Sequence, residues 1–511
     1  MNFKQAILAF LTLVAGLVIG SSLLGSLQEP QVQNRLDLYQ TNIVLKASEW
    51  ERLRSEDGDD SLFSALFGGK SVDEAIQTYR EARDTSRANI NKILTEIPAL
   101  SAGENQKSAG AVRQFVRQLE KSLREQRDFL AEVDLNLGIL EARQGNLESA
   151  QKIWRELAEE TGVRLDLVKT ARVLEGLWSQ PALLLPDSAE LIQANLQGWF
   201  RNTALSQLYQ VQERSEALTQ LQQQIQETAE DAVTKLFLVG ITPYIMGLVG
   251  LGLIVFLLFQ RVRWGKEALL ARYGDTPWPT PWDGYTILEV LVVGFFLVGQ
   301  FVAPLLVSAI LQFFHLGNDV RSQAIRVFSS YLLVAFAAIA ILWNAIRSYF
   351  PLESDWFRFR FRSNWILWGV GGYCVAIPVV LIISLLNQQL WQGKGGSNPL
   401  LQLVLEGKDT LALSLFFSTA AIAAPLFEEL LFRGFLLPSL TRYMSVWGAI
   451  GLSSLIFAAA HLSISELLPL FSLGMILGIV YTRSRNLLAP MLVHALWNTG
   501  TMLTLLVLGS E

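Results

Sequence analysis

The stretch LALSLFFSTAAIAAPLFEELLFRG, residues 411–434, decides the fold of this chain. Its first 17 residues carry no charge, and it then places Glu428, Glu429 and Arg433 within six residues. A long apolar run of this kind predicts a membrane-spanning helix. Each ionised group in the middle of such a helix costs about 2.5–3.5 kcal/mol on insertion scales. Three of them so close together therefore require an explanation.

The spacing of the three charges predicts two different carboxylates. Arg433 follows Glu429 by four residues, so the two lie on one helix face and can pair. Glu428 lies about 100° away around the helix and has no such partner. This division predicts one carboxylate in a structural ion pair and one free to take a proton from water. In the alternative interpretation, the charges lie at the cytoplasmic end of the span and are solvated.

Histidine is scarce, and its placement adds to this pattern. The chain has only His315, His461 and His494. His461 follows Phe457 by four residues, and His494 precedes Asn498 by four, so each pair shares a helix face. A lone histidine on an apolar helix is more often a packing residue. Together with Glu428, however, these side chains supply a general base and donors for a developing oxyanion.

Apolar runs separated by short charged loops predict nine transmembrane helices, and the fold class is predicted to be all-α. The first run is longer than the core of a cleaved signal peptide, which favours an uncleaved signal anchor. The tryptophan-rich loop at residues 276–282 is predicted to lie at the headgroup level. The predicted spans are residues 6–27, 236–259, 286–310, 327–346, 365–386, 411–436, 447–462, 467–481 and 488–508.

A polar segment rich in Gln, Glu, Arg and Leu separates the first two spans and predicts an extramembrane helical domain. The sequence around Gly138 and Trp154 resembles one tetratricopeptide repeat, in which Trp154 would fill the gap between two antiparallel helices. An irregular helical bundle is the other interpretation. The end of the segment predicts a long helix that continues into the second span. The predicted domains are 1–28, the signal anchor; 29–235, the helical domain; 236–400, transmembrane helices 2–5; and 401–511, the catalytic core.

Lysine and arginine in the short loops predict the orientation, because cytoplasmic loops are enriched in them. Successive loops lie on opposite sides of the membrane. The loops on one side carry 12 such residues, and those on the other side carry four. The richer set is therefore predicted to be cytoplasmic, with a cytoplasmic N-terminus and residues 29–235 outside the cytoplasm. The richer set consists of Lys4, Arg261, Arg263, Lys266, Arg272, Arg347, Arg358, Arg360, Arg362, Arg442, Arg483 and Arg485, and the other of Arg321, Arg326, Lys394 and Lys408.

The composition restricts the classes of function. A hydrophobic fraction of 51% is typical of a protein with both a bilayer part and a soluble part. A net charge of −5 gives no electrostatic basis for binding nucleic acid. The single cysteine, Cys374, excludes a disulfide or a cysteine-based metal site within one chain.

The order Glu-Glu-x-x-x-Arg, Phe-x-x-x-His and His-x-x-x-Asn resembles the CPBP family of intramembrane glutamic endopeptidases. That family includes the type II CAAX prenyl endopeptidases and bacterial proteins once labelled abortive-infection or bacteriocin-processing proteins. The resemblance covers roughly residues 400–508. It implies roles for six residues: water activation for Glu428 and His461, oxyanion stabilisation for His494 and Asn498, and support of the site for Glu429 and Arg433.

Three functions follow as hypotheses. The first is an intramembrane endopeptidase that acts on a peptide or membrane-protein substrate within the lipid bilayer, without an obligatory metal. The second is a zinc protease in which Glu428, His461 and His494 hold the ion and leave one position for water, although the chain lacks His-Glu-x-x-His. The third is a scaffold that binds a protein partner through residues 29–235. Prenylated substrates are not carried over from the family, because no prenyl-binding groove is evident in the sequence.

Overall fold

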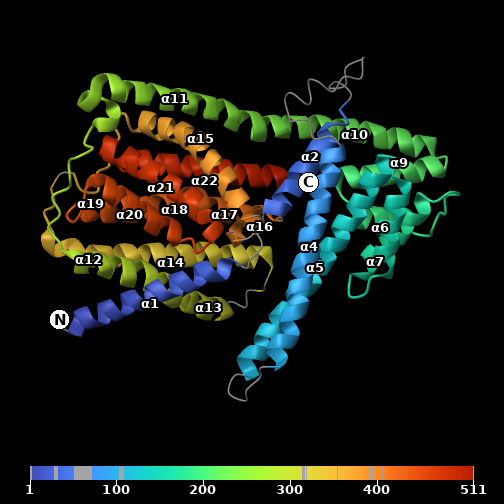
Figure 1. The fold of residues 1–511 in the computed structure, drawn as a ribbon, viewed down its shortest axis with the longest axis horizontal. Helices are drawn as coiled ribbons and strands as arrows, with labels where there is room; N and C mark the ends of the chain where they lie inside the picture. The colour runs from blue at the N-terminus through green and yellow to red at the C-terminus, as the bar shows by residue number, and fades with distance from the viewer. Residues whose placement is uncertain are drawn as a thin grey trace. The chain divides into compact units, whose positions relative to one another are not determined.

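The computed structural model shows an all-helical chain, without a β-strand among the residues that it describes. These are residues 3–27, 33–50, 72–102, 109–313, 317, 319–353, 355–391, 395–396, 398–405 and 407–509. The chain divides into two compact units (Figure 1). One contains Met1–Val32 and Ile241–Ser510, and the other contains Gln33–Gly240.

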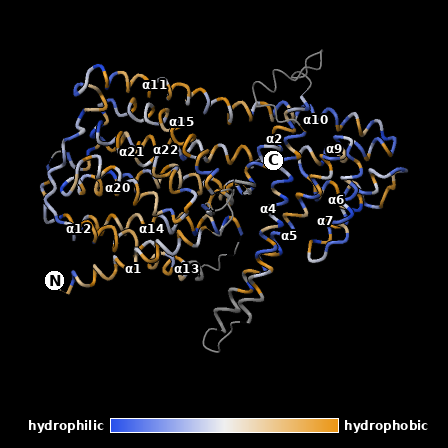
Figure 2. Tube along the Cα trace, viewed as in Figure 1, coloured by the Kyte–Doolittle hydropathy of each residue, from blue (hydrophilic) through white to orange (hydrophobic). Residues whose placement is uncertain are grey.

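Eight helices of the described chain are long and apolar enough to cross a membrane, which confirms the prediction of a multi-pass membrane protein. Figure 2 shows hydrophobic residues along most of α1, α11, α14, α15, α21 and α22. The eight are Phe3–Ser26 (α1), Ser215–Glu267 (with α11, Thr242–Trp264), Gly284–Ile310, Val320–Tyr349 (with α14, Val320–Ile346), Trp365–Trp391 (α15), Thr410–Leu440, Ile464–Ser484 (α21) and Leu488–Gly509 (α22).

Of the nine predicted spans, eight are long enough to cross a membrane in the described part of the chain, and the ninth is a shorter apolar helix. The run predicted at 447–462 forms α20, Val446–Ala459, which has only 14 residues. At 1.5 Å per residue it measures about 21 Å, against roughly 30 Å for the hydrocarbon core. The backbone then turns through Leu462, which has a left-handed φ of 56°, and α21 begins at Ile464. The sequence predicted the end of this run at residue 462, three residues beyond the end of the helix.

The tryptophan-rich loop packs against the protein. Trp278 and Trp282 are 2% and 0% exposed, so both rings are buried within the protein. The Trp278 amide donates to Thr441 Oγ1 at 3.0 Å, and the Trp282 indole N–H donates to Ser439 Oγ at 2.9 Å. These bonds fasten the loop to the end of the span that carries the glutamate pair. The headgroup level of the loop stays a prediction.

Two close helix contacts position the last spans. An added Cβ at Gly474 of α21 would lie 2.9 Å from Ser454 Cβ of α20, and one at Gly478 would lie 2.9 Å from Ile450 Cγ2. Small residues four apart let two helix backbones approach closely inside a membrane protein. This approach brings the carbonyl of Gly474 within reach of the span Thr410–Leu440.

The second unit is a bundle of helices around one apolar core. Trp154 fills the space above Gly138, where a Cβ would lie 2.2 Å from its indole nitrogen, as predicted. The tetratricopeptide assignment finds no such support, because α4 and α5 have 31 and 35 residues while a whole repeat has about 34. The helices are α2 (Gln33–Ala47), α4 (Val72–Ala102), α5 (Ala109–Arg143), α6 (Leu147–Glu159), α7 (Leu165–Leu177), α8 (Ser188–Asn195), α9 (Gly198–Val211) and α10 (Ser215–Leu236).

Candidate active site

The helix that carries the glutamate pair changes its winding on both sides of the pair. Glu428 and Glu429 end a short α-helical stretch that lies between two π-helical segments. Such segments inside α-helices occur frequently at functional sites, because they re-aim the side chains that follow. In order, the span contains α17 (Thr410–Ser418), π-helical Thr419–Ala423, α18 (Ala424–Glu429), π-helical Leu430–Leu436 and α19 (Leu437–Leu440).

Glu429 and Arg433 form the predicted ion pair. Arg433 Nη1 lies 2.8 Å from Glu429 Oε1, and both side chains are 0% exposed. Arg433 Nη2 donates to the Gly474 carbonyl at 3.1 Å, and its guanidinium lies 4.5 Å from the centroid of the Phe457 ring. The pair therefore joins the glutamate helix to both α20 and α21.

His494 reaches both glutamates. Its Nδ1 lies 2.8 Å from Glu429 Oε1, and because an ionised carboxylate only accepts, Nδ1 carries the proton and donates. Its Nε2 lies 4.0 Å from Glu428 Oε2. Glu429 thus orients the His494 ring, and the free ring nitrogen is directed at Glu428.

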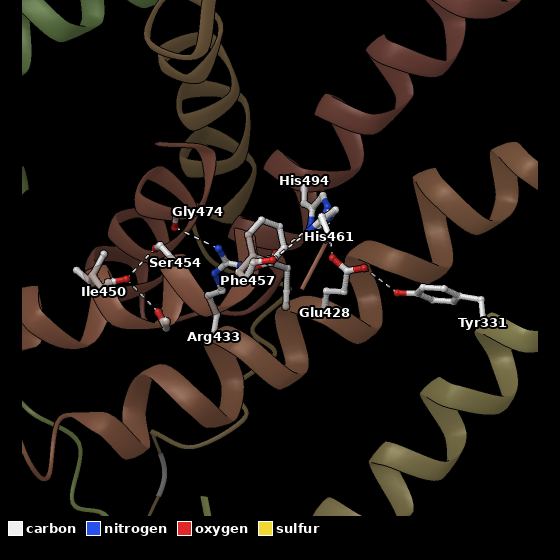
Figure 3. A network of polar contacts seen from close by, with 11 residues as sticks. Tyr331, Glu428, Arg433, Ile450, Ser454, Phe457, His461, Gly474 and His494 are labelled. Carbon is white, nitrogen blue, oxygen red and sulfur yellow. Dashed lines mark hydrogen bonds and ion pairs between the residues drawn. The ribbon is translucent and has the colours of Figure 1, made fainter. Parts of the chain in front are cut away.

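Glu428 has a partner that the sequence analysis missed. The hydroxyl of Tyr331, in α14, donates to Glu428 Oε1 at 3.0 Å. The other oxygen, Oε2, is buried and has no hydrogen-bond partner in the described part of the chain. Figure 3 shows Tyr331 and His494 approaching Glu428 from different sides. A hydroxyl in the middle of an apolar span was the only signal in the sequence, and it does not identify a partner.

His461 lies in the turn after α20, at the edge of the same cluster. Its Nδ1 lies 2.9 Å from the Phe457 carbonyl, which only accepts, so this nitrogen donates and Nε2 is left as an acceptor. The Phe457 ring packs edge-on against His461 at 5.1 Å and against His494 at 5.8 Å. One phenylalanine therefore holds both imidazoles near the glutamate pair.

Asn498 is on the same helix as His494 but has a different contact. Its Nδ2 donates to the Ala420 carbonyl at 2.7 Å, within the π-helical segment Thr419–Ala423. The second N–H of the amide remains for another acceptor. Its predicted role at an oxyanion stays a prediction. His315 lies outside the described residues.

The zinc hypothesis stays an alternative prediction. Among the described residues, no three His, Cys, Asp or Glu side chains converge in a way that could hold a metal ion. In the zinc hypothesis, Glu428, His461 and His494 would be ligands. Nδ1 of each histidine bonds to a protein oxygen, which leaves Nε2 as the free ring nitrogen, and His494 Nε2 lies 4.0 Å from Glu428 Oε2.

An apolar cavity of about 500 Å³ adjoins the glutamate helix. It lies between the helix that carries Tyr331 and the helix that carries Glu428, and Phe427 is part of its wall. A second apolar cavity of about 540 Å³ shares Ile339 and Leu430 with it. Apolar space thus begins one residue away from the partly buried carboxylate of Glu428.

Comparison with known proteins finds a family whose sequences resemble part of the chain. The model of the Rce1-like type II CAAX prenyl endopeptidases matches residues 410–500, a range that contains all six predicted site residues. The membrane-embedded CAAX protease MroQ of Staphylococcus aureus (strain USA300) is 24% identical over 217 residues, covering 41% of this chain and 85% of the relative.

Two further relatives are covered less completely. The putative membrane peptidase YdiL of Bacillus subtilis (strain 168) is 25% identical over 134 residues, covering 26% of this chain and 54% of the relative. An uncharacterized 24.3 kDa protein of Escherichia coli is 36% identical over 140 residues, covering 26% of this chain and 62% of the relative. No solved structure matches the chain significantly. The chain is therefore a multi-pass membrane protein whose residues 410–500 belong to the Rce1-like type II CAAX prenyl endopeptidase (CPBP) family of membrane peptidases.

Proposed function

We propose that this protein is an intramembrane endopeptidase in which Glu428 and His461 activate the attacking water. One observation carries the proposal: Glu428 Oε2 is buried, has no partner in the described chain, and lies 4.0 Å from His494 Nε2. That separation is too long for a direct hydrogen bond. It is suited to a water or reacting group shared by the two side chains.

The reaction follows from these positions. Glu428 Oε2 accepts a proton from water while the water oxygen attacks the peptide carbonyl carbon, with His461 Nε2 as a second acceptor for the water. The carbonyl oxygen becomes an oxyanion. The protonated Glu428 then gives its proton to the leaving nitrogen as the C–N bond breaks, and this returns the carboxylate. General-base catalysis of this kind contributes about 100- to 10,000-fold to the rate.

His494 and Asn498 are proposed to stabilise the oxyanion. His494 can donate from Nε2 only as an imidazolium, because its Nδ1 proton is already bonded to Glu429. The adjacent carboxylates of Glu428 and Glu429 would compensate that positive charge. Asn498 has one N–H left after its bond to Ala420. Each donor at an oxyanion is worth roughly 100- to 1,000-fold in kcat.

The substrate is proposed to be a peptide or membrane protein that presents an apolar part next to the cleaved bond. The cavity of about 500 Å³ beside Phe427 supports this, since its walls are almost entirely apolar side chains. The nature of that apolar part is left open, because side chains and lipid groups would both fit such walls.

The charge distribution supports the proposed placement in the membrane. The N-terminus and the loops at 441–445 and 485–487 would face the cytoplasm, and residues 29–235 would lie outside it. The helical unit would then recruit a protein partner or substrate without contributing to the chemistry. The domain limits proposed from the sequence remain 1–28, 29–235, 236–400 and 401–511.

A comparison of peptide termini in membranes tests the function. Membranes with the wild-type protein, Glu428→Gln and the control Glu289→Gln are compared; Glu289 is an exposed carboxylate in another span. We expect termini that are present in the wild type and the control and absent in Glu428→Gln. Unchanged termini and phenotype in Glu428→Gln would instead favour the scaffold. Loss of activity in a strong chelator would favour the zinc protease.

A further inference from the structure

We propose that Tyr331 is a positioning residue for Glu428. Its hydroxyl holds Oε1, so that Oε2 is the oxygen that receives the proton of the attacking water. This inference rests on the proposed peptidase function and adds to it a residue from outside the family-matched segment, since α14 ends at Ile346 and the match begins at residue 410.

The contact has a defined direction. Tyr331 O–H lies 3.0 Å from Glu428 Oε1, and an ionised carboxylate can only accept, so the phenol is the donor. Hydrogen bonds to a charged group are stronger than those between neutral groups. The second oxygen is buried and makes no hydrogen bond in the described chain. The two oxygens of one carboxylate are therefore unequal before any substrate binds.

The tyrosine ring is itself fixed by packing. It lies edge-on to the Phe427 ring, with 6.1 Å between centroids and an angle of 84°. Phe427 is 4% exposed and contacts Phe295, with 6.2 Å between the ring centroids. Because Phe427 directly precedes Glu428, the same stretch of helix carries both the carboxylate and the surface that orients its donor.

A second group competes for Glu428. His494 Nε2 lies 4.0 Å from Oε2, and when the imidazole is protonated, an unrestrained glutamate side chain could rotate toward it and accept its proton in a direct hydrogen bond. Such a contact would occupy the oxygen that the mechanism needs. The Tyr331 hydrogen bond opposes this rotation and keeps the gap open. Glu429 is not free to fill the gap, because it is bonded to Arg433 and His494.

Tyr331→Phe in the full-length protein tests the inference, because it removes one hydroxyl and keeps the ring. The assay uses a peptide whose cleavage depends on Glu428, as identified by the comparison of termini. We expect kcat to fall about tenfold or more, since a hydrogen bond to a charged group is worth roughly that much, with KM changed less than twofold. The matched control is Tyr349→Phe, at the end of the same span and outside the site. An unchanged kcat in Tyr331→Phe would overturn the inference.

Infrared spectroscopy tests the contact without a substrate. The Glu428 carboxylate band is isolated by subtracting the spectrum of Glu428→Gln from that of the wild type. We expect this band to shift in Tyr331→Phe and to shift in the opposite sense when 3-fluorotyrosine, a stronger donor of nearly the same shape, replaces Tyr331. The fluorinated protein keeps the test valid even if Tyr331→Phe does not fold. A band that moves in neither protein would overturn the inference.

The two proposals can fail separately. If Glu428→Gln leaves every cleavage intact, the peptidase function fails, whatever the infrared spectra show. If Glu428→Gln abolishes cleavage while Tyr331→Phe and the fluorinated protein behave as wild type, only the role of Tyr331 fails.

Discussion

Glu428 and Glu429 are neighbours in the sequence but have different surroundings. Glu429 is fully buried and is bonded to Arg433 and His494. Each glutamate keeps its Oε2 without a partner in the described chain, but the Glu428 side chain is 15% exposed and the Glu429 side chain 0%. Removal of one partner from a buried ion pair leaves an uncompensated charge, whereas the loss of a free carboxylate does not. Substitution of Glu429 should therefore lower the stability of the protein, whereas substitution of Glu428 should lower its activity.

Arg433→Met should destabilise the membrane unit. The substitution leaves Glu429 charged and buried, and breaking such a pair costs about 3–5 kcal/mol. Thermal unfolding in detergent should show a lowered Tm, together with a smaller yield of folded protein. Arg261→Met, at an exposed arginine near the end of α11, is the control and should unfold like the wild type. Equal Tm values for the two variants would contradict a structural role for the pair.

Asp134 should make the stability of the soluble unit depend on pH. Burial raises the pKa of Asp134 from 3.8 to about 6, and the nearby Arg83 offsets only part of this effect. Because the folded pKa exceeds the unfolded one, protonation stabilises the fold, and that stability is lost as the pH rises through 6. The shift corresponds to about 3 kcal/mol between pH 4 and pH 7.

Hydrogen exchange of the α4 and α5 amides in the full chain measures this dependence. Protection, corrected for intrinsic exchange rates, should decrease from pH 5 to pH 7 in the wild type. Asp134→Asn should flatten the dependence, and Asp84→Asn, at an exposed position of α4, should retain it. The same slope in all three proteins would exclude Asp134 as its source.

Among the helices, the α20–α21 contact supports the site most directly. Because Gly474 has no side chain, α20 can approach closely, and the Gly474 carbonyl accepts a hydrogen bond from Arg433. The π-helical segments on either side of α18 have a comparable effect within one helix, since one of them supplies the carbonyl that Asn498 binds. The backbone geometry of these helices thus fixes the positions of the Arg433 and Asn498 side chains, which the spacing of the motifs alone does not define.

Gly474→Ala should destabilise the protein although alanine favours helices. A Cβ there would lie 2.9 Å from Ser454 Cβ and 3.1 Å from Ser454 Cα, so the backbones must separate. The matched control is Gly451→Ala in α20, where a Cβ would have no atom within 4 Å; there the better helix propensity, worth up to about 1 kcal/mol, applies without a clash. We expect a lower Tm for Gly474→Ala and an equal or higher Tm for Gly451→Ala. The reverse order would refute the close contact.

Across the full chain, the features that could be predicted from the sequence are those that a local pattern of residues determines. Long apolar runs gave the multi-pass class, and the four-residue spacing predicted the Glu429–Arg433 pair that the structure contains. The end of α20 was predicted only to within three residues, because Ala460 and Leu462 extend the apolar run beyond Ala459. The Tyr331–Glu428 contact was not predictable, because it joins residues 97 positions apart and only the packing of helices brings them together.

The predicted orientation can be measured with the single cysteine removed. Cys374 is buried in α15, so Cys374→Ser gives a background without thiols. We expect Ser215→Cys, in the helical unit, to react with an impermeant maleimide on intact cells, and Arg442→Cys to react only after permeabilisation. Labelling of both positions from the same side would contradict the orientation that the loop charges predict.

The shortness of α20 also concerns the lipid around the protein. Its exposed side chains, Trp447 and Leu455 at 47% and 46%, cover only about two thirds of a typical hydrocarbon thickness. Acyl chains against this face meet hydrophobic mismatch, which a membrane relieves by local thinning at a cost of fractions of a kcal/mol per Å. The turn that carries His461 lies at the end of this face, so bilayer thickness would set how easily water reaches it. Turnover in vesicles should therefore fall as the lipid acyl chains are lengthened.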